Sequence, residues 1–222
     1  MQSLHPLAMA GVAQHSDYRN DPWGRLQRTA DFLATTTFGP VDEVEKIIAR
    51  IKMVHTRVTG FASDGRPYSA NDPHLLRWVH VAEVDSFLAA HQRYGAYPLD
   101  QQGRDGYVQD VAVIARLLGV PNPPESEKEL KQQLHDYRPE LASTDESRDA
   151  AKYLIFEPPL PATARVAYSA LVAATIATLP SWTRKPLRLP LLPITEKFAL
   201  RPLGDAVTRA IRWATVPTSP YK

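Results

Sequence analysis

Two residues in one predicted helix could bind a small polar ligand. Arg25 and Thr29 lie four residues apart, so they share one helix face, which Phe32 continues and beside which Arg28 lies. A guanidinium and a hydroxyl on one face can orient an anion or dioxygen. The alternative is a solvated arginine and a threonine that bonds to its own helix.

His55 interrupts the apolar face of the next predicted helix. Val44, Ile48, Ile51 and Val58 form the rest of that face. A histidine in such a position is either a hydrogen-bonded core residue or a ligand, and one axial histidine is enough to hold haem iron. His55 is therefore the leading metal-ligand candidate.

His80 repeats the pattern on the following helix, where it shares a face with Leu76, Val84 and Phe87. It is the alternative axial ligand, or a second one. His91 follows Phe87 by four residues.

Three other histidines have simpler explanations. His5 precedes Pro6 at the start of a helix, where a capping or loop role is natural. We expect His15 to cap the end of that helix through its last carbonyl groups. His74 lies close to an N-cap and is expected to be exposed.

The composition limits the classes of protein. The chain has 222 residues, 44% of them hydrophobic and 23% charged, which suits one large domain. A net charge of +2 gives no argument for a nucleic-acid partner. The absence of cysteine excludes disulfides, iron–sulfur clusters, thiolate-ligated haem and cysteine nucleophiles. No cationic run precedes the first apolar stretch, so we expect a cytoplasmic protein.

Prolines at helix starts and glycines at helix ends predict one all-α domain over residues 1–222. No hairpin signal is apparent, and "ASDGRPYSA" is expected to be a loop with a turn at Asp64-Gly65. A Pro-rich connection, "PSWTRKPLRLPLLP", precedes the last helix, and residues 216–222 are expected to fray. The predicted helices cover residues 4–15, 22–38, 41–59, 73–94, 104–118, 126–137, 147–156, 162–179 and 203–215.

The most apolar segment, Val166–Pro180, is too short for a membrane span and has Arg165 at its entry. We expect a buried helix there, and peripheral membrane contact is the alternative.

The sequence lacks H-E-x-x-H, Gly-rich phosphate loops, G-x-S-x-G and the E-x-x-H pairs of di-iron sites. Their absence argues against hydrolases, nucleotide enzymes and di-iron oxygenases.

Several stretches together resemble the catalytic-domain superfamily of the MpaB oxygenases and the latex-clearing protein, a rubber oxygenase. They are "HPLAMAGVAQHS", "DPWGRLQRTADFLATTTFG", "VHTRVTG", "YSANDPHLLRWVH", "LLGVPNPPES" and "LPSWTRKPLRLP". The resemblance covers nearly the whole chain. It implies an all-α, globin-reminiscent fold that holds haem b and, in characterised branches, oxidative cleavage of a carbon–carbon double bond in an isoprenoid chain.

The resemblance also implies roles for individual residues. The rubber oxygenase motif has a distal arginine, a threonine four residues later and a lysine directly before that threonine. The motif resembles Arg25 and Thr29, with Arg28 in the lysine position. The proximal haem ligand lies in a segment similar to "MVHTRV", which carries that role to His55.

Two features depart from the family pattern. The family has a helix or more before the His-Pro motif, whereas this chain begins almost at the motif, so the N-terminal helix is short or missing. The rubber oxygenase also uses an acidic residue upstream of its arginine. The nearest carboxylates here are Asp17 and Asp21, and the general base is left unassigned.

The sequence leaves three functions open. The first is a haem b-dependent oxygenase that acts with dioxygen on a hydrophobic, isoprenoid- or lipid-like substrate, in a pocket lined by residues such as Phe32, Leu76 and Phe87. The second is a non-haem metal oxidoreductase, for which no carboxylate is expected near the histidines. The third is a non-catalytic lipid- or terpenoid-binding protein. The sequence also leaves open whether the protein forms a homodimer. The histidines considered for the non-haem metal are His5, His15, His55 and His80.

Overall fold

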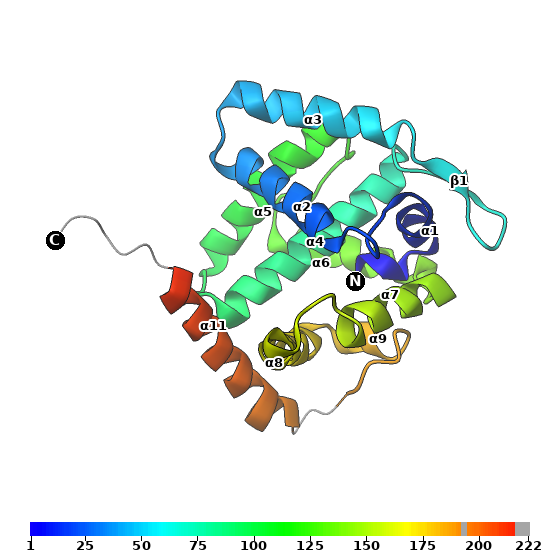
Figure 1. Ribbon diagram of the computed structural model, residues 1–222. Helices are drawn as coiled ribbons and strands as arrows, with labels where there is room; N and C mark the ends of the chain where they lie inside the picture. The colour runs from blue at the N-terminus through cyan, green and yellow to red at the C-terminus, as the bar shows by residue number, and fades with distance from the viewer. Residues whose placement is uncertain (192–194, 216–222) are drawn as a thin grey trace. The chain divides into compact units, whose positions relative to one another are not determined.

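The structure is a computed structural model that describes residues 1–191 and 195–215 (Figure 1). It is all-α apart from one short hairpin, which confirms the predicted fold class. The chain divides into two compact units, residues 1–85 with 100–146 and residues 86–99 with 147–222. That residues 1–222 form one domain stays a prediction.

The first unit contains all of the predicted site residues except Phe87, and α4 (Pro73–Tyr94) contributes its first part to it. Its other elements are η1 (Gln2–Leu4), α1 (Pro6–His15), α2 (Pro22–Phe38), α3 (Val41–His55), β1 (Thr59–Phe61), β2 (Pro67–Ser69), α5 (Gln101–Leu118), α6 (Glu127–Asp136) and η2 (Arg138–Glu140).

Local signals fix the ends of two helices as predicted. The Asp21 carboxylate accepts a hydrogen bond from the Gly24 N–H at 2.9 Å and caps α2. Asp100 caps α5 in the same way, so α5 begins three residues earlier than predicted. Gly119 ends α5 in the left-handed region, with φ of +100°.

The segment after α3 differs from the prediction. α3 ends at His55, and β1 pairs antiparallel with β2 where a helix end and a loop were expected. Each strand has only three residues, too few to show an alternating pattern. Tyr68 of β2 is buried against Ala10 of α1 and Val58, so long-range packing determines this hairpin.

The core of the first unit ties the start of the chain to α4. Trp78 is fully buried, and its Nε1–H donates to the Gln2 carbonyl oxygen at 3.0 Å. Val81 of α4 and Leu130 of α6 are also fully buried. The residues just after Gln2 are thereby held beside the N-terminal half of α4.

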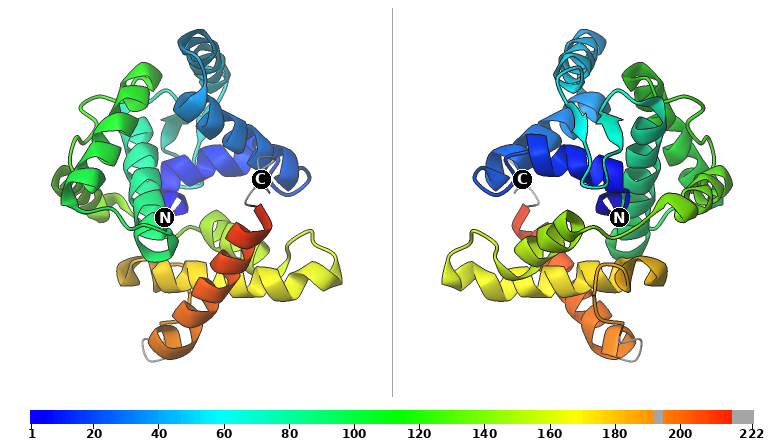
Figure 2. Two further views of the ribbon diagram at one scale, coloured as in Figure 1. Left: turned by 90° about the vertical axis from the view of Figure 1, so that its left-hand side faces the viewer. Right: turned by 90° about the vertical axis from the view of Figure 1, so that its right-hand side faces the viewer.

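The second unit is built around α8 (Ala162–Thr178) and α11 (Arg201–Thr215), which cross in contact with each other (Figure 2). A Cβ added at Gly204 would meet Ala174 and Tyr94 at 2.8 Å, so the close approach requires glycine there. Arg93 forms a two-bond ion pair with Asp205 at 2.9 and 3.0 Å. The unit also contains α7 (Asp145–Phe156) from Ser147 onward, α9 (Ser181–Arg184) and the π-helical η3 (Glu196–Leu200).

The prediction of a buried helix around Val166–Pro180 is wrong for most of α8. Only Ala174 and Ala177 of α8 are buried, and Val166 is 81% exposed. Alanine presents little apolar area to a core, so an alanine-rich helix can lie at the surface. Within the described residues, no helix is both long and apolar enough to cross a membrane.

Other differences concern element ends. Residues 181–184 are helical within the predicted Pro-rich connection, α7 begins at Asp145, and α11 begins at Arg201. The end of that connection and the tail predicted to fray lie outside the described residues.

A buried ion pair in the second unit should matter for its stability. Arg184 pairs with Glu196, and both side chains are buried. We expect Glu196→Gln to lower the free energy of unfolding by roughly 3 kcal/mol, because Arg184 loses its counter-ion inside the protein. Urea unfolding of the full chain measures this. Lys46→Ala is the control. It removes the exposed ion pairs of Lys46 with Asp42 and Glu43 and should leave the urea midpoint unchanged. Equal midpoints for the wild type and Glu196→Gln would contradict the prediction.

Candidate functional site

The two leading candidates lie on consecutive helices that pack on each other, α2 and α3, joined by Gly39 and Pro40 (Figure 1). Arg25 lies fourteen residues before Gly39, and His55 lies fifteen residues after Pro40. At 1.5 Å per residue, each is about 20 Å along its helix from the connection. Each residue therefore lies near the end of its helix that is away from the connection.

Arg25 has a half-buried side chain whose guanidinium forms no hydrogen bond or ion pair with any residue that the structure describes. Burial lowers the pKa of Arg25. Thr29 is exposed, and its Oγ1 donates to the Arg25 carbonyl oxygen at 3.1 Å. Of the two, Arg25 thus keeps its donors available, whereas Thr29 uses its proton within its own helix.

Arg28 lies at the surface. Its Nη1 is 3.2 Å from the Asp21 carboxylate, and both side chains are more than half exposed. Asp21, one of the two upstream carboxylates considered as an acid partner for Arg25, thus serves as the helix cap and the partner of Arg28. Phe32 is half-buried, and α2 has no fully buried residue.

His55 is the last residue of α3 and is half-buried. Burial lowers its pKa, and its ring makes no hydrogen bond within residues 1–191 and 195–215. A neutral imidazole keeps one nitrogen lone pair, as a metal ligand must. Burial therefore favours the neutral form of His55, which the predicted role requires.

His80 is in a similar state on α4. Its Nε2 is buried and has no hydrogen-bond partner in the described part of the chain, and burial lowers its pKa to about 4. Glu83 follows one turn later, and burial raises its pKa. Burial also raises the pKa of Tyr107 on α5, with a smaller contribution from the Glu83 charge. The inner side of α4 thus holds a second imidazole and a carboxyl group.

Sequence reasoning missed Glu83. The signal was its position three residues after His80 in an otherwise apolar stretch, which places both on one helix face. Phe87, which was expected to line an apolar pocket, is 42% exposed, whereas Leu76 is half-buried.

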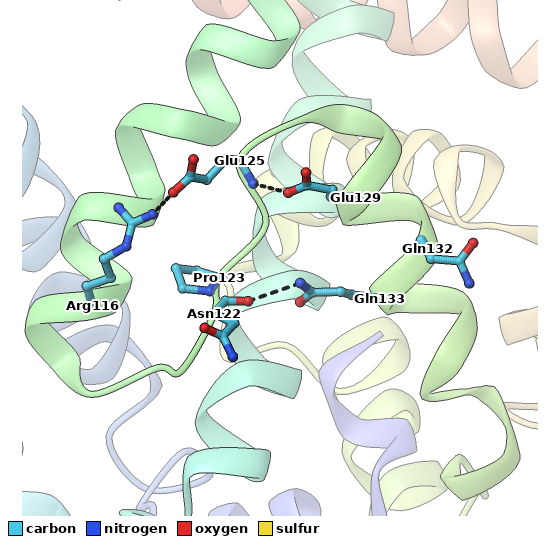
Figure 3. Close-up of a pocket in the computed structure, with 7 residues that line it drawn as sticks. All are labelled: Arg116, Asn122, Pro123, Glu125, Glu129, Gln132 and Gln133. Carbon is cyan, nitrogen blue, oxygen red and sulfur yellow. Dashed lines mark hydrogen bonds and ion pairs between the residues drawn. The ribbon is translucent and has the colours of Figure 1, made fainter.

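A cleft of about 640 Å³ lies elsewhere, beside the loop between α5 and α6 (Figure 3). Its polar groups largely satisfy one another: Arg116 pairs with Glu125, and Gln133 donates to the Asn122 carbonyl oxygen at 3.0 Å. None of the predicted site residues lines this cleft, and its polar lining does not suit a hydrophobic substrate.

Of the remaining histidines, His15 and His5 differ from expectation. The His15 Nε2 lies 3.2 Å from the Thr59 carbonyl oxygen and 3.1 Å from the Tyr68 hydroxyl, so it contacts the hairpin and does not cap α1. His5 is at the N-cap position of α1 but makes no side-chain cap hydrogen bond, and it is buried. His74 is exposed, as expected.

The expectation that no carboxylate lies near these histidines is also wrong. His5, His74 and Glu140 form one cluster. Glu140 follows His74 by sixty-six residues, so no local pattern could indicate it.

Comparison with known proteins agrees with the predicted resemblance. The family model described as "ER-bound oxygenase mpaB/B'/Rubber oxygenase, catalytic domain" matches residues 1–213. The chain belongs to this family of oxygenase catalytic domains. A search of curated proteins and a search of solved structures found no match.

The state of His80 predicts a pH dependence of stability. Its pKa is 6.5 in the unfolded chain and about 4 in the folded protein, so the unfolded chain binds more protons between these values. The stability gained from a neutral His80 is present above pH 6.5 and is lost as the pH falls toward 4. Between pH 7 and pH 5 this loss amounts to about 2 kcal/mol.

Urea unfolding at both pH values measures this loss. His80→Leu should lose less stability than the wild type on acidification, whereas His135→Ala, at an exposed position, should behave as the wild type does. The same loss in the wild type and His80→Leu would contradict the assignment.

Proposed function

We propose that this protein is a haem b-dependent oxygenase that acts on a hydrophobic, isoprenoid- or lipid-like substrate by oxidative cleavage of a carbon–carbon double bond. The family match supports an oxygenase. The observation that supports the haem assignment is that the half-buried side chains of Arg25 and His55, on the contacting helices α2 and α3, make no hydrogen bond within the described residues. Cytoplasmic location stays a prediction.

The residues present fit a haem. A histidine that holds haem iron must be a neutral imidazole with an available lone pair, and burial favours that form in His55, which would hold the iron. The buried Nε2 of His80 has no hydrogen-bond partner among the described residues, so His80 would hold the iron in place of His55 or together with it. When bound, haem supplies the electron transfer and oxygen chemistry that amino-acid side chains lack.

Arg25 is assigned to orient dioxygen. A guanidinium has five N–H donors and no acceptor, and in Arg25 these donors are not used by other described residues. Thr29 donates its proton to the Arg25 carbonyl oxygen, so its hydroxyl can still accept a hydrogen bond. Arg28, which pairs with Asp21 at the surface of α2, would add positive charge near the site. Phe32 would provide apolar surface near the substrate.

Glu83 is the candidate for holding a proton. Burial raises its pKa, so this carboxyl group can take up and release a proton closer to neutral pH than an exposed glutamate can. Its position one turn from His80 provides the acidic group that the sequence left unassigned.

The first test is the haem content of single variants. Purified His55→Ala should lose stoichiometric haem, measured as the pyridine haemochrome, because the axial ligand is removed. His91→Ala replaces an exposed histidine and is the matched control, which should bind as much haem as the wild type. Full haem in His55→Ala together with its loss in His80→Ala would transfer the ligand role to His80. Full haem in both single variants and in the double variant would contradict the proposal.

The second test addresses Arg25 without requiring a known substrate. Arg25→Leu should keep its haem but be reoxidised by air about tenfold faster after reduction, because the donors that orient dioxygen are lost. Arg28→Leu, at the exposed position three residues later, should be reoxidised at nearly the wild-type rate. Equal rates for Arg25→Leu and the wild type would remove the role assigned to Arg25.

A further inference from the structure

Three residues far apart in the sequence bring potential metal ligands together in the first unit. His5 lies at the start of α1, His74 in the first turn of α4, and Glu140 at the end of η2. One ligand atom from each residue lies within 4.8 Å of the others. Glu140 Oε2 is 2.8 Å from the His74 Nε2 and 3.6 Å from the His5 Nε2.

His5 is the unusual member of this cluster because it is only 2% exposed. Both of its ring nitrogens are buried, and neither has a hydrogen-bond partner among the described residues. A neutral imidazole has one N–H donor and one lone pair, and leaving both unpaired inside a protein is costly. A ligand between His5 and Glu140 would satisfy one of these nitrogens.

His74 has a hydrogen-bond network that fixes its ring. The Tyr137 hydroxyl donates to the His74 carbonyl oxygen at 2.8 Å. The Tyr137 oxygen can then accept from the His74 Nδ1–H, which lies 3.4 Å away. The His74 Nε2, on the other side of the ring, lies 2.8 Å from the Glu140 carboxylate oxygen.

The surroundings suit an ion better than an organic molecule. The adjoining cleft has a volume of about 120 Å³ and is lined by His74, Glu140, Tyr137 and Asp136, with Gln133 and Arg77. This is too small for a hydrophobic substrate but has room for the water that completes a coordination shell. The Glu140 and Asp136 carboxylates offset the positive charge of Arg77.

We propose that His5, His74 and Glu140 bind one divalent transition-metal ion. Two imidazoles and one carboxylate are a ligand set for zinc or ferrous iron, whereas magnesium and calcium prefer oxygen ligands. The ion would link the entry of α1 to α4 and η2, in the region where Trp78 already holds Gln2. This site is independent of the proposed haem function, since it shares no residue with it.

Zinc serves as the probe. The full-length protein without a histidine tag is treated with EDTA, dialysed against buffered zinc and analysed for metal, with haem measured in the same samples. The wild type should retain one zinc per chain and no magnesium. His74→Ala and Glu140→Gln should bind zinc roughly tenfold more weakly or worse. His135→Ala, which removes an exposed histidine of the same unit, should bind as the wild type does.

Thermal unfolding provides a second measurement. Zinc should raise the melting temperature of the wild type and of His135→Ala, but not that of Glu140→Gln, because binding to the folded state stabilises it. Zinc retention by the wild type no greater than that of His74→Ala would overturn the proposal, and His74 would then be a hydrogen-bond partner of Glu140 only. Haem is expected to be equal in all these variants, so loss of zinc binding and loss of haem are distinguishable results.

Discussion

Burial of imidazole rings inside a cysteine-free helical protein is the constraint on which this structure depends. A buried imidazole ring must be neutral or paired with an opposite charge, and both of its nitrogens need a hydrogen-bond partner or a ligand. Burial lowers the pKa of His80 to about 4. His5 is buried, and neither of its ring nitrogens forms a hydrogen bond with a described residue. Such an arrangement costs free energy that an apolar residue would not, which favours a ligand-binding role for these positions.

The helices position these rings from different parts of the chain. α2 and α3 carry Arg25 and His55, each near the end of its helix that is away from their two-residue connection. α4 contributes His74 near its start and His80 about two turns later, and the fully buried Trp78 lies between them. The same helix thus connects the proposed haem region with the proposed metal site in the first unit.

The sequence was informative where structure depends on neighbouring residues. Asp21 with Pro22 predicted the start of α2, and Gly119 predicted the end of α5, because caps and left-handed glycines act locally. The hairpin at Tyr68 and the position of Glu140 could not be predicted, since both depend on contacts between distant segments. The family match over residues 1–213 confirmed the resemblance, whereas the roles of Arg25, Arg28, Thr29, Phe32, His55 and His80 stay predictions.

The visible absorption spectrum of the purified wild-type protein, before and after reduction with dithionite, shows directly whether the protein holds haem. We expect a strong Soret band that shifts on reduction, because neutral imidazoles in the first unit would hold haem iron. A colourless protein that also fails to take up added hemin would contradict the account. His55 and His80 would then be buried structural histidines.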